Sequence, residues 1–414
     1  MKKYHITAIL FFLILILNFF LSKPLRVIYI DNTAELEKLF QKPQKSIDLR
    51  LAPGDYNLIS ESIIDSTCGN CEDPNTPIQT TVGITISGKN IKISGPNDRT
   101  AIIYTNAGYG FYIKDCENCI LENLSITGGV RDTSAFASDA AIVIKNSDVI
   151  IRNNKIFNNL GDSLLIAENI IGIMGICGRE NSNINIFNNE ILRNSWDGIA
   201  LYRDSEAIIE KNIIDGIDKA GARVPKGGRG VGIGVTWNAK ARIRNNLVKR
   251  YWKGIGLFVD ADAEVKNNII ENMITWGISL WDADKGKPKG EISNNIIYNL
   301  GAMGAAITSC VEEEPGYFIE NIIVKTAQDS AYDSPDYYGF QCALAEHSVP
   351  ENFVIENNLF FNNRRATEDL PDYDVSEEEF KKELKLRKEW IRKIPLLEKS
   401  DFYKDFIKIK PMSN

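Results

Sequence analysis

The chain has 414 residues, of which 44% are hydrophobic and 25% are charged. This balance is ordinary for a folded protein and excludes a mainly disordered chain. The net charge of −7 argues against nucleic acid as a partner, because that role calls for a broadly basic face. The sequence contains only two histidines, which argues strongly against a multi-histidine metal site.

The N-terminus has the pattern of an export signal. Lys2 and Lys3 precede an apolar run from Ile6 to Leu21, and no small residues suited to a cleavage site follow it. The run has 16 residues, fewer than the ~20 of a membrane-spanning helix. We therefore expect export to the extracellular space or cell envelope. Residues 1–22 are either a cleaved signal peptide or an anchor that tethers the protein to a membrane through residues 6–21.

A short helix and two cysteine pairs follow. Residues 33–40 have an apolar side and are expected to form a capping helix. Cys68 and Cys71 form one Cys-x-x-Cys pair, and Cys116 and Cys119 form another after 44 intervening residues. That separation is too long for a zinc ribbon and favours disulfides in an exported chain. Zinc binding and a redox role stay open as alternatives.

An asparagine recurs along most of the chain. In most cases two apolar residues follow it and a glycine-led apolar strand comes later, at intervals of 35, 23, 34, 22, 27, 26 and 37 residues. The apolar residues alternate or form short β-branched runs, which predicts strands. A unit of about 22 residues with insertions predicts a parallel β-helix whose asparagines hydrogen-bond from coil to coil. The asparagines are Asn154, Asn189, Asn212, Asn246, Asn268, Asn295, Asn321 and Asn358.

The glycine-led strands predict a binding surface on the outside of the solenoid. Side chains alternate between the two faces of a strand, so each of these strands turns a small residue and, in three cases, an aromatic residue outward. Coils are about 4.8 Å apart, which is comparable to the spacing of rings in an extended polysaccharide. The alternative is that the aromatic residues pack on one another or under a loop. The residues expected to bind a polysaccharide or oligosaccharide are Tyr202, Arg203, Trp237, Phe258 and Trp281.

Polar residues beside the glycines are the candidates for catalysis. Asp197 and Lys253 occupy matching positions in coils two steps apart, and Arg229 lies close to the equivalent place in the coil between them. An acid, a guanidinium group and an amine along one edge supply acid/base function and carboxylate recognition. Solvated turn residues are the alternative.

Two Asp-Ala-Asp sequences fall at nearly the same turn of adjacent coils. Asp260, Asp262, Asp282 and Asp284 would bring four carboxylates together, and calcium is one way to hold them. Aspartate is also an ordinary turn residue, so calcium binding is one of two alternatives.

The C-terminal region predicts a second helical cap. Ser376 with Glu379 three residues later is a capping box, and the helix it begins has an apolar side that would cover the last coil as a lid. The expected fold is all-β with helical caps. Its parts are an export segment 1–22, an N-terminal cap 23–60, one parallel β-helix 61–365 and a C-terminal cap 366–414.

The segment from Val27 to Asn363 resembles the right-handed parallel β-helix proteins of the pectin-lyase-like superfamily, especially their NosD-like, carbohydrate-binding and sugar-hydrolase branch. The resemblance rests on Pro53-Gly54-Asp55-Tyr56, the repeated Asn-Asn-x-Ile turns and the terminal segment Asp405-Phe406-Ile407-Lys408-Ile409-Lys410-Pro411. Catalytic motifs of polygalacturonases, pectate lyases and mannuronan epimerases are absent from the sequence, so no catalytic residue is carried over. The scarcity of histidine argues against the copper role of NosD.

The leading hypothesis is an exported, carbohydrate-active protein that binds an extended, uronate-rich polysaccharide, with cleavage by lyase or hydrolase chemistry left open. The alternative is a non-catalytic envelope scaffold or adhesin. Loop placement distinguishes them, because loops on one face wall a substrate groove. The insertions at residues 131–140 and 220–230 should then flank the aromatic residues.

Overall fold

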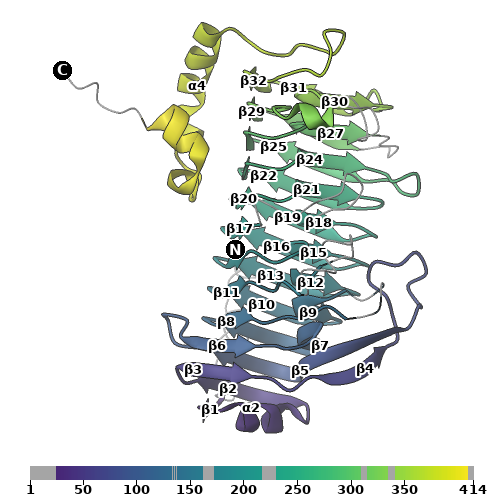
Figure 1. Cartoon of the computed structure of the whole chain (residues 1–414), viewed down its shortest axis with the longest axis vertical. Helices are drawn as coiled ribbons and strands as arrows, with labels where there is room; N and C mark the ends of the chain where they lie inside the picture. Colours follow the sequence, from purple (N-terminus) through teal and green to yellow (C-terminus); the bar gives the residue numbers. More distant parts are fainter. Residues whose placement is uncertain are drawn as a thin grey trace, which may run out of the picture.

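The computed structural model describes residues 25–408, apart from 133, 135, 137, 162–171, 217–229, 309–314 and 334–340. In this part of the chain, short strands wind into one solenoid whose coils stack along the long axis of the molecule (Figure 1). Equivalent strands of successive coils pair in parallel, which confirms the predicted parallel β-helix. A full coil contributes three strands, and we name the three resulting faces sheets 1, 2 and 3.

Sheet 1 contains the glycine-led strands. The long strands β5 and β7 bend from sheet 1 into sheet 2, and β4 (Glu61–Asp65) pairs antiparallel with the start of β5. The strands of sheet 1 are the first halves of β5 (Ile78–Ser94) and β7 (Tyr109–Glu122), then β9 (Ala140–Lys145), β12 (Met174–Arg179), β15 (Ile199–Leu201), β18 (Val231–Val235), β21 (Lys253–Phe258), β24 (Trp276–Trp281), β27 (Ala305–Thr308) and β30 (Leu344–His347).

Sheets 2 and 3 complete the coils. Sheet 2 contains β1 (Arg26–Ile30), β2 (Gln44–Leu51), the second halves of β5 and β7, β10 (Asp148–Arg152), β13 (Asn183–Phe187), β16 (Glu206–Glu210), β19 (Lys240–Arg244), β22 (Asp262–Lys266), β25 (Lys289–Ser293), β28 (Gly316–Ile319) and β31 (Val354–Glu356). Sheet 3 contains β3 (Gly54–Asn57), β6 (Ala101–Tyr104), β8 (Ser125–Thr127), β11 (Lys155–Phe157), β14 (Glu190–Leu192), β17 (Ile213–Asp215), β20 (Leu247–Lys249), β23 (Ile269–Glu271), β26 (Ile296–Tyr298), β29 (Ile322–Val324) and β32 (Leu359–Phe361).

Aliphatic side chains fill the interior of the coils. Ile199, Ile233, Ile255 and Ile278 pair in register from coil to coil and are fully buried. Each buried side chain of this size contributes about 1.5–3 kcal/mol relative to exposure, so the stack is the main source of stability. The alternation that the sequence predicts for these strands is confirmed.

The predicted asparagine ladder is also present. The side-chain amide of Asn246 donates to Oδ1 of Asn268, and the same pattern continues through the other asparagines of the series. The residue before each ladder asparagine has a positive φ, as at Asn245 (59°) and Asn267 (56°). Asparagine tolerates this left-handed conformation better than most residues, which explains the repeated Asn-Asn pairs.

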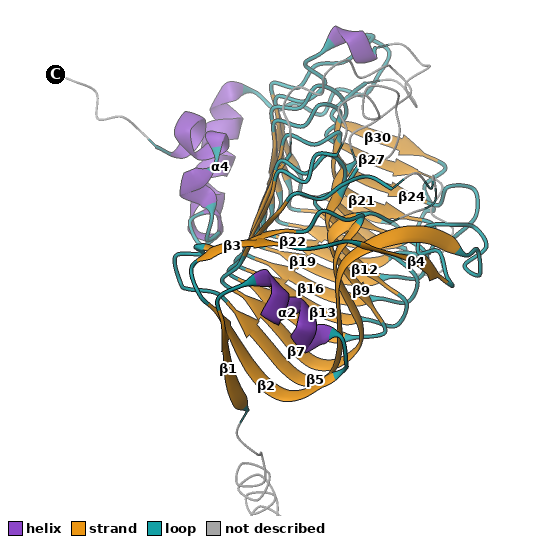
Figure 2. Cartoon of the chain, turned by 60° about the horizontal axis from the view of Figure 1, so that its bottom comes forward, coloured by secondary structure: helices purple, strands orange, loops and turns teal. Residues whose placement is uncertain are grey.

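The two helical segments have different roles. Helix α2 (Thr33–Phe40) is capped by Asn32 and lies across the N-terminal end of the solenoid, where Leu36 and Phe40 join the core (Figure 2). The predicted N-terminal capping helix is therefore confirmed. Helix α4 (Glu377–Ile391) begins at Ser376, whose side chain accepts a hydrogen bond from the backbone of Glu379, as the capping box predicts.

The expectation that α4 covers the last coil as a lid is wrong. The helix lies beside the solenoid, along the outer face of sheet 3 (Figure 1). Phe380 stacks on Phe361 of β32, and Phe380 and Leu384 belong to one apolar cluster with outward residues of sheet 3 such as Ile269 and Ile296. The short helices η3 (Leu397–Lys399) and η4 (Tyr403–Ile407) extend the same cover, whereas η1 (Ser330–Tyr332) precedes β30. At the end of the solenoid, Tyr373 stacks on Phe360 with ring centres 5.0 Å apart.

Both Cys-x-x-Cys pairs form disulfides, Cys68 with Cys71 and Cys116 with Cys119, as expected. Cys177 and Cys342 are buried with free thiols. None of the helices in the described part of the chain is long and apolar enough to span a membrane. The export segment, residues 1–22, and Cys310 lie outside the described residues.

Candidate functional site

The outer face of sheet 1 carries a row of small residues next to a row of larger ones. Gly234, Gly256, Ser279, Ala306 and Ala345 pair in register on successive strands and form the small row. Strand alternation places a row of larger residues on the same face two positions later, namely Phe258, Trp281, Thr308 and His347. Val231, Lys253 and Trp276 stand three positions before the small row, at the start of their strands, and Trp276 clusters there with Ala306.

A pocket lies at the C-terminal end of this face. Its volume is about 630 Å³, and it lies between β24, β27, β30 and the segment Leu370–Tyr373. The side chains that line it are Trp276, Met303, Ala306, Thr308, Cys342, Leu344, Ala345, Glu346, His347, Leu370, Pro371 and Tyr373. The wall is therefore mainly apolar and aromatic, with a carboxylate, an imidazole and hydroxyl groups at its rim.

The polar rim comes from the end of β30. Glu346 and His347 are exposed, and the hydroxyl of Tyr373 donates to Oε1 of Glu346 at 3.0 Å. Burial, together with the neighbouring Glu346 carboxylate, raises the pKa of Tyr373, so its hydroxyl remains a donor. Cys342 lies deeper, and burial raises the pKa of its thiol to about 11. This thiol is therefore protonated at neutral pH and is a poor nucleophile.

Aromatic residues continue from the pocket toward the N-terminus. The ammonium group of Lys253 lies 4.3 Å from the centre of the Trp276 ring and 5.3 Å from that of Phe258. Phe258 and Trp281 make an edge-to-face contact with ring centres 6.4 Å apart, and both are partly exposed. The aromatic residues thus contact one another, as the alternative interpretation expected, while two of them keep an exposed surface.

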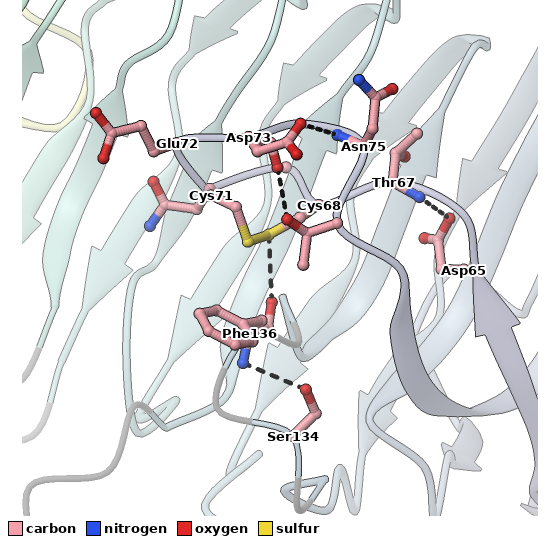
Figure 3. Close-up of a disulfide and its surroundings, with 12 residues drawn as sticks. Asp65, Thr67, Cys68, Cys71, Glu72, Asp73, Asn75, Ser134 and Phe136 are labelled. Carbon is pink, nitrogen blue, oxygen red and sulfur yellow. Dashed lines mark hydrogen bonds between the residues drawn. A yellow bond between two sulfur atoms is a disulfide. The ribbon is translucent and has the colours of Figure 1, made fainter.

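Three of the predicted binding residues are covered by the chain itself. Residues 66–77, which we call the strap, join β4 to β5 and carry the Cys68–Cys71 disulfide (Figure 3). Tyr202 clusters with outer-face residues such as Ala200 but is only 6% exposed, so the open groove predicted beside it is wrong. Arg203 donates to the carbonyl oxygens of Gly69 and Cys71. Trp237 donates to Asn70 at 3.0 Å.

The three catalytic candidates do not form one open site. Asp197 aligns with Val231 and Lys253 on successive coils, as predicted, but it is only 6% exposed and accepts a hydrogen bond from the backbone of Val231 at 2.6 Å. Burial raises the pKa of Asp197 to about 7, although this hydrogen bond lowers it in part. Lys253 lies two coils away, a distance of about 10 Å at 4.8 Å per coil. Arg229 lies outside the described residues.

The four aspartates predicted to bind calcium are not gathered into one group. Asp260 accepts from the backbone of Lys287, and Asp282 accepts from the backbone of Asp284. Asp262 begins β22 on sheet 2, where Lys240 and Lys289 are its register neighbours. Within the ranges that the structure describes, no three acidic, histidine or cysteine side chains are placed to hold a metal ion. The turn contacts explain these positions without a cation.

One of the two insertions lies close to the outer face of sheet 1. Residues 131–140 connect β8 of sheet 3 to β9 of sheet 1, and the carbonyl oxygen of Phe136 lies 3.7 Å from the Cys68 sulfur (Figure 3). This insertion therefore lies against the strap. That the insertions flank Phe258 and Trp281 stays a prediction. The insertion at residues 220–230 lies almost entirely outside the described residues, but Gly230 directly precedes β18 of the same sheet.

Comparisons with known proteins agree with this architecture. The family described as "Right handed beta helix region" matches residues 54–255. The chain therefore has the right-handed parallel β-helix fold. A search of curated proteins found no match for this β-helix protein. The comparisons do not test its place in the NosD-like branch, which stays a prediction.

Solved structures share the fold at low identity. The Dettilon tailspike protein (gp208) is 14% identical with a TM-score of 0.50, and the alignment covers 81% of this chain and 61% of the tailspike. An exopolygalacturonase from Thermotoga maritima is 12% identical with a TM-score of 0.49, over 83% of this chain and 85% of the enzyme. An alginate lyase from Paenibacillus sp. str. FPU-7 is 13% identical with a TM-score of 0.37, over 80% and 98%. The likeness to the tailspike protein extends to the fold alone.

Sequence reasoning missed most of the pocket. Glu346, His347 and Tyr373 fall after the clear repeats, and Tyr373 reaches the pocket only because its segment folds back over the last coil. The single histidine outside residues 1–22 was a usable signal, since an isolated imidazole at a strand end is unusual in this composition.

Proposed function

We propose that this β-helix protein binds an oligosaccharide segment of an extended polysaccharide on the outer face of sheet 1. The observation that carries the proposal is the lining of the pocket between β24, β30 and Leu370–Tyr373. Trp276, Met303 and Tyr373 provide apolar and aromatic surface, and Glu346 and His347 provide polar groups at the rim. Ligand sites of this kind combine a mainly apolar wall with a few placed polar groups.

The chemistry of a sugar matches this lining. The apolar face of a sugar ring packs on an aromatic ring, while its hydroxyl groups hydrogen-bond to carboxylate, imidazole and hydroxyl side chains. Lys253, beside Trp276, adds a cation that would attract a sugar carboxylate. Phe258 and Trp281 extend the partly exposed aromatic surface along the coils, so more than one sugar unit is accommodated.

Binding is better supported than cleavage. Glycoside hydrolysis uses two carboxyl groups roughly 5–9.5 Å apart. Among the described residues that line the pocket, Glu346 is the one carboxylate. Asp197 is buried and lies two coils before Lys253. These two residues are therefore not placed to act together as acid and base in an elimination reaction. Product assays distinguish lyase or hydrolase activity from the alternative of an envelope scaffold.

Export belongs to the same proposal. It rests on the N-terminal sequence, and the two disulfides are consistent with it because disulfides persist mainly in oxidising compartments. A polysaccharide partner outside the cell would be accessible to such a protein.

Calorimetric titration of the purified chain with acidic and neutral oligosaccharides tests the proposal. Ala345→Phe fills the pocket and should lower affinity by about tenfold or more, which is about 1.4 kcal/mol, without a large change in melting temperature. Ile208→Phe adds the same ring at an exposed position on sheet 2 and serves as the matched control. Failure of every oligosaccharide to bind, or equal affinity of Ala345→Phe and the parent, would contradict the proposal.

The same samples should be assayed for new reducing ends and for unsaturated sugar products. Reducing ends without unsaturation would identify a hydrolase, and unsaturated products would identify a lyase. Binding with neither product would leave a non-catalytic binding protein.

A further inference from the structure

The strap lies over the N-terminal half of the outer face of sheet 1. The pocket lies at the C-terminal end of the same face. The strap is held by side chains from the ends of four successive strands of sheet 1, namely Lys145, Arg179, Arg203 and Trp237. Every one of these side chains donates to an oxygen atom of the strap or of Asp65, which precedes it. The strap tip also reaches the turn after β24, where Lys285 lies 3.3 Å from Glu72.

The deepest contact is a carboxylate held by two cations. Lys145 donates to Oδ1 of Asp65 at 2.6 Å and to the hydroxyl of Thr67 at 2.7 Å, and Arg179 donates to Oδ2 of Asp65. Arg179 also lies 2.9 Å from the carboxylate of Glu180, so its positive charge is shared between the carboxylates of Asp65 and Glu180. A lysine and an arginine around one carboxylate are the groups that would recognise an acidic sugar.

The strap does not use all the donors beneath it. Arg179 is fully buried, yet its Nη1 atom has no hydrogen-bond partner. The hydroxyl of Tyr109 is likewise buried without a partner, and its ring centre lies 5.8 Å from the guanidinium carbon of Arg179. Buried donors without partners are uncommon and call for a cause. A ligand that carries hydroxyl groups beside its carboxylate would satisfy more of them than Asp65 does.

The strap is held mainly by polar contacts. Its buried apolar contribution is Cys68 with the partly buried Cys71, which cluster with Ile78 of β5 separately from the main core. The disulfide joins two residues of the strap and does not attach the strap to the coils. Segments with little buried apolar surface open at a lower free energy than the core, so the strap can lift without unfolding the solenoid.

We propose that the strap, together with Asp65 at the end of β4, is a built-in occupant of an anion-binding extension of the groove, in which Asp65 takes the place of a sugar carboxylate between Lys145 and Arg179. Acidic oligosaccharides displace it, and the proposal rests on the oligosaccharide binding proposed above. Short ligands bind in the open pocket. Long acidic ligands also bind the part of the outer face of sheet 1 that the strap covers. Their apparent affinity is reduced by the fraction of molecules in which the strap is closed.

Hydrogen exchange on the unaltered full chain tests the displacement directly. A galacturonate hexamer should accelerate exchange of the amides of residues 66–77, and a neutral glucose hexamer should not. Exchange in β16 and β19, on sheet 2, is the internal reference. Unchanged or slower exchange in the strap at saturating galacturonate hexamer would overturn the proposal.

A variant of the strap provides the affinity test. Asp65→Asn removes the carboxylate that Lys145 and Arg179 hold, and should raise affinity for the galacturonate hexamer about tenfold while leaving affinity for a galacturonate dimer unchanged. If this variant fails to fold, Asn70→Ala combined with Glu72→Ala removes only contacts of exposed strap residues to Trp237 and Lys285. That variant should raise affinity for the galacturonate hexamer about threefold.

The outcomes separate this inference from the proposed function. Binding that Ala345→Phe weakens, with no change in strap exchange and no gain in the strap variants, would show that the strap is a fixed part of the structure. In that case the pocket proposal stands and the inference is overturned. If no oligosaccharide binds at all, both are overturned.

Discussion

The side-chain oxygen of Asn246 accepts hydrogen bonds from both the backbone and the side-chain amide of Asn212, one coil earlier. The Asn246 amide then donates to Asn268 in the next coil and to two carbonyl oxygens. Each ladder asparagine therefore satisfies buried groups of its neighbours as well as its own. A break in the ladder leaves polar groups unpaired on both sides.

Asn246→Ala should destabilise the protein by about 2–4 kcal/mol, since each buried polar group left unpaired costs about 1–3 kcal/mol. Asn245→Gly, at the preceding residue with its φ of 59°, should cost much less because glycine adopts this conformation readily. Urea unfolding of both variants measures the difference. Equal destabilisation would show that the ladder hydrogen bonds contribute little beyond local turn structure.

The buried carboxyl of Asp197 predicts a pH dependence of stability. Its folded pKa of about 7 lies above the ordinary 3.8, so between pH 4 and 7 the folded state keeps a proton that the unfolded state has lost. The free energy of unfolding should therefore fall as pH rises through this window. Asp139 and Glu271, with pKa values also raised to about 7 by burial, should act in the same direction.

Asp197→Asn removes one part of this dependence. The variant should be more stable than the parent at pH 8, by up to about 4 kcal/mol at 1.36 kcal/mol per pKa unit, and nearly equal to it at pH 4. Asp148→Asn, at an exposed position, is the control and should change neither value much. Thermal melts from pH 4 to 8 provide the test. A variant that is less stable than the parent at pH 8 would mean that the ionised carboxylate of Asp197 stabilises the fold.

Trp276 and Trp281 should differ in their contribution to stability. Trp276 is only 8% exposed, so Trp276→Ala should cost about 3–5 kcal/mol, as for a buried aromatic residue. Trp281 is partly exposed, so Trp281→Ala should cost less while still weakening oligosaccharide binding. Melts and calorimetric titrations on both variants separate the two effects. Equal loss of stability would place Trp281 in the core.

The position of α4 predicts a local effect of its removal. Phe380 stacks on Phe361 with ring centres 4.3 Å apart, and Phe380→Ala should loosen the helix from the outer face of sheet 3. Hydrogen exchange should then rise in α4 and in β26, β29 and β32, whereas α2 at the other end should be unaffected. A uniform rise along the chain would instead indicate that the helix controls the whole solenoid.

Calcium should have no effect on the melting temperature, because Asp260 and Asp282 already accept backbone hydrogen bonds in turns. Melts with added calcium and with a chelator measure this. A rise that Asp260→Asn with Asp282→Asn abolishes would establish the calcium site instead, since a cation that binds only the folded state stabilises it.

The sequence by itself determined the solenoid, the position of α2 and the start of α4. These features depend on local patterns: the alternation around Ile233 and Ile255, the asparagine repeat, and the caps at Asn32 and Ser376. A coil contacts mainly its neighbours, so a repeat in the sequence specifies the contacts directly.

Only the tertiary structure decided which part of the outer face is open. Arg203 contacts Gly69 across 134 residues of sequence, and α4 packs on the outer face of sheet 3 instead of across the end of the last coil. The strap and the C-terminal segment do not repeat, so no period indicates where they dock. Their positions follow from apolar surface and charged groups that exist only after the coils have stacked, which is why Tyr202 and Arg203 are covered while the pocket beside Trp276 is open.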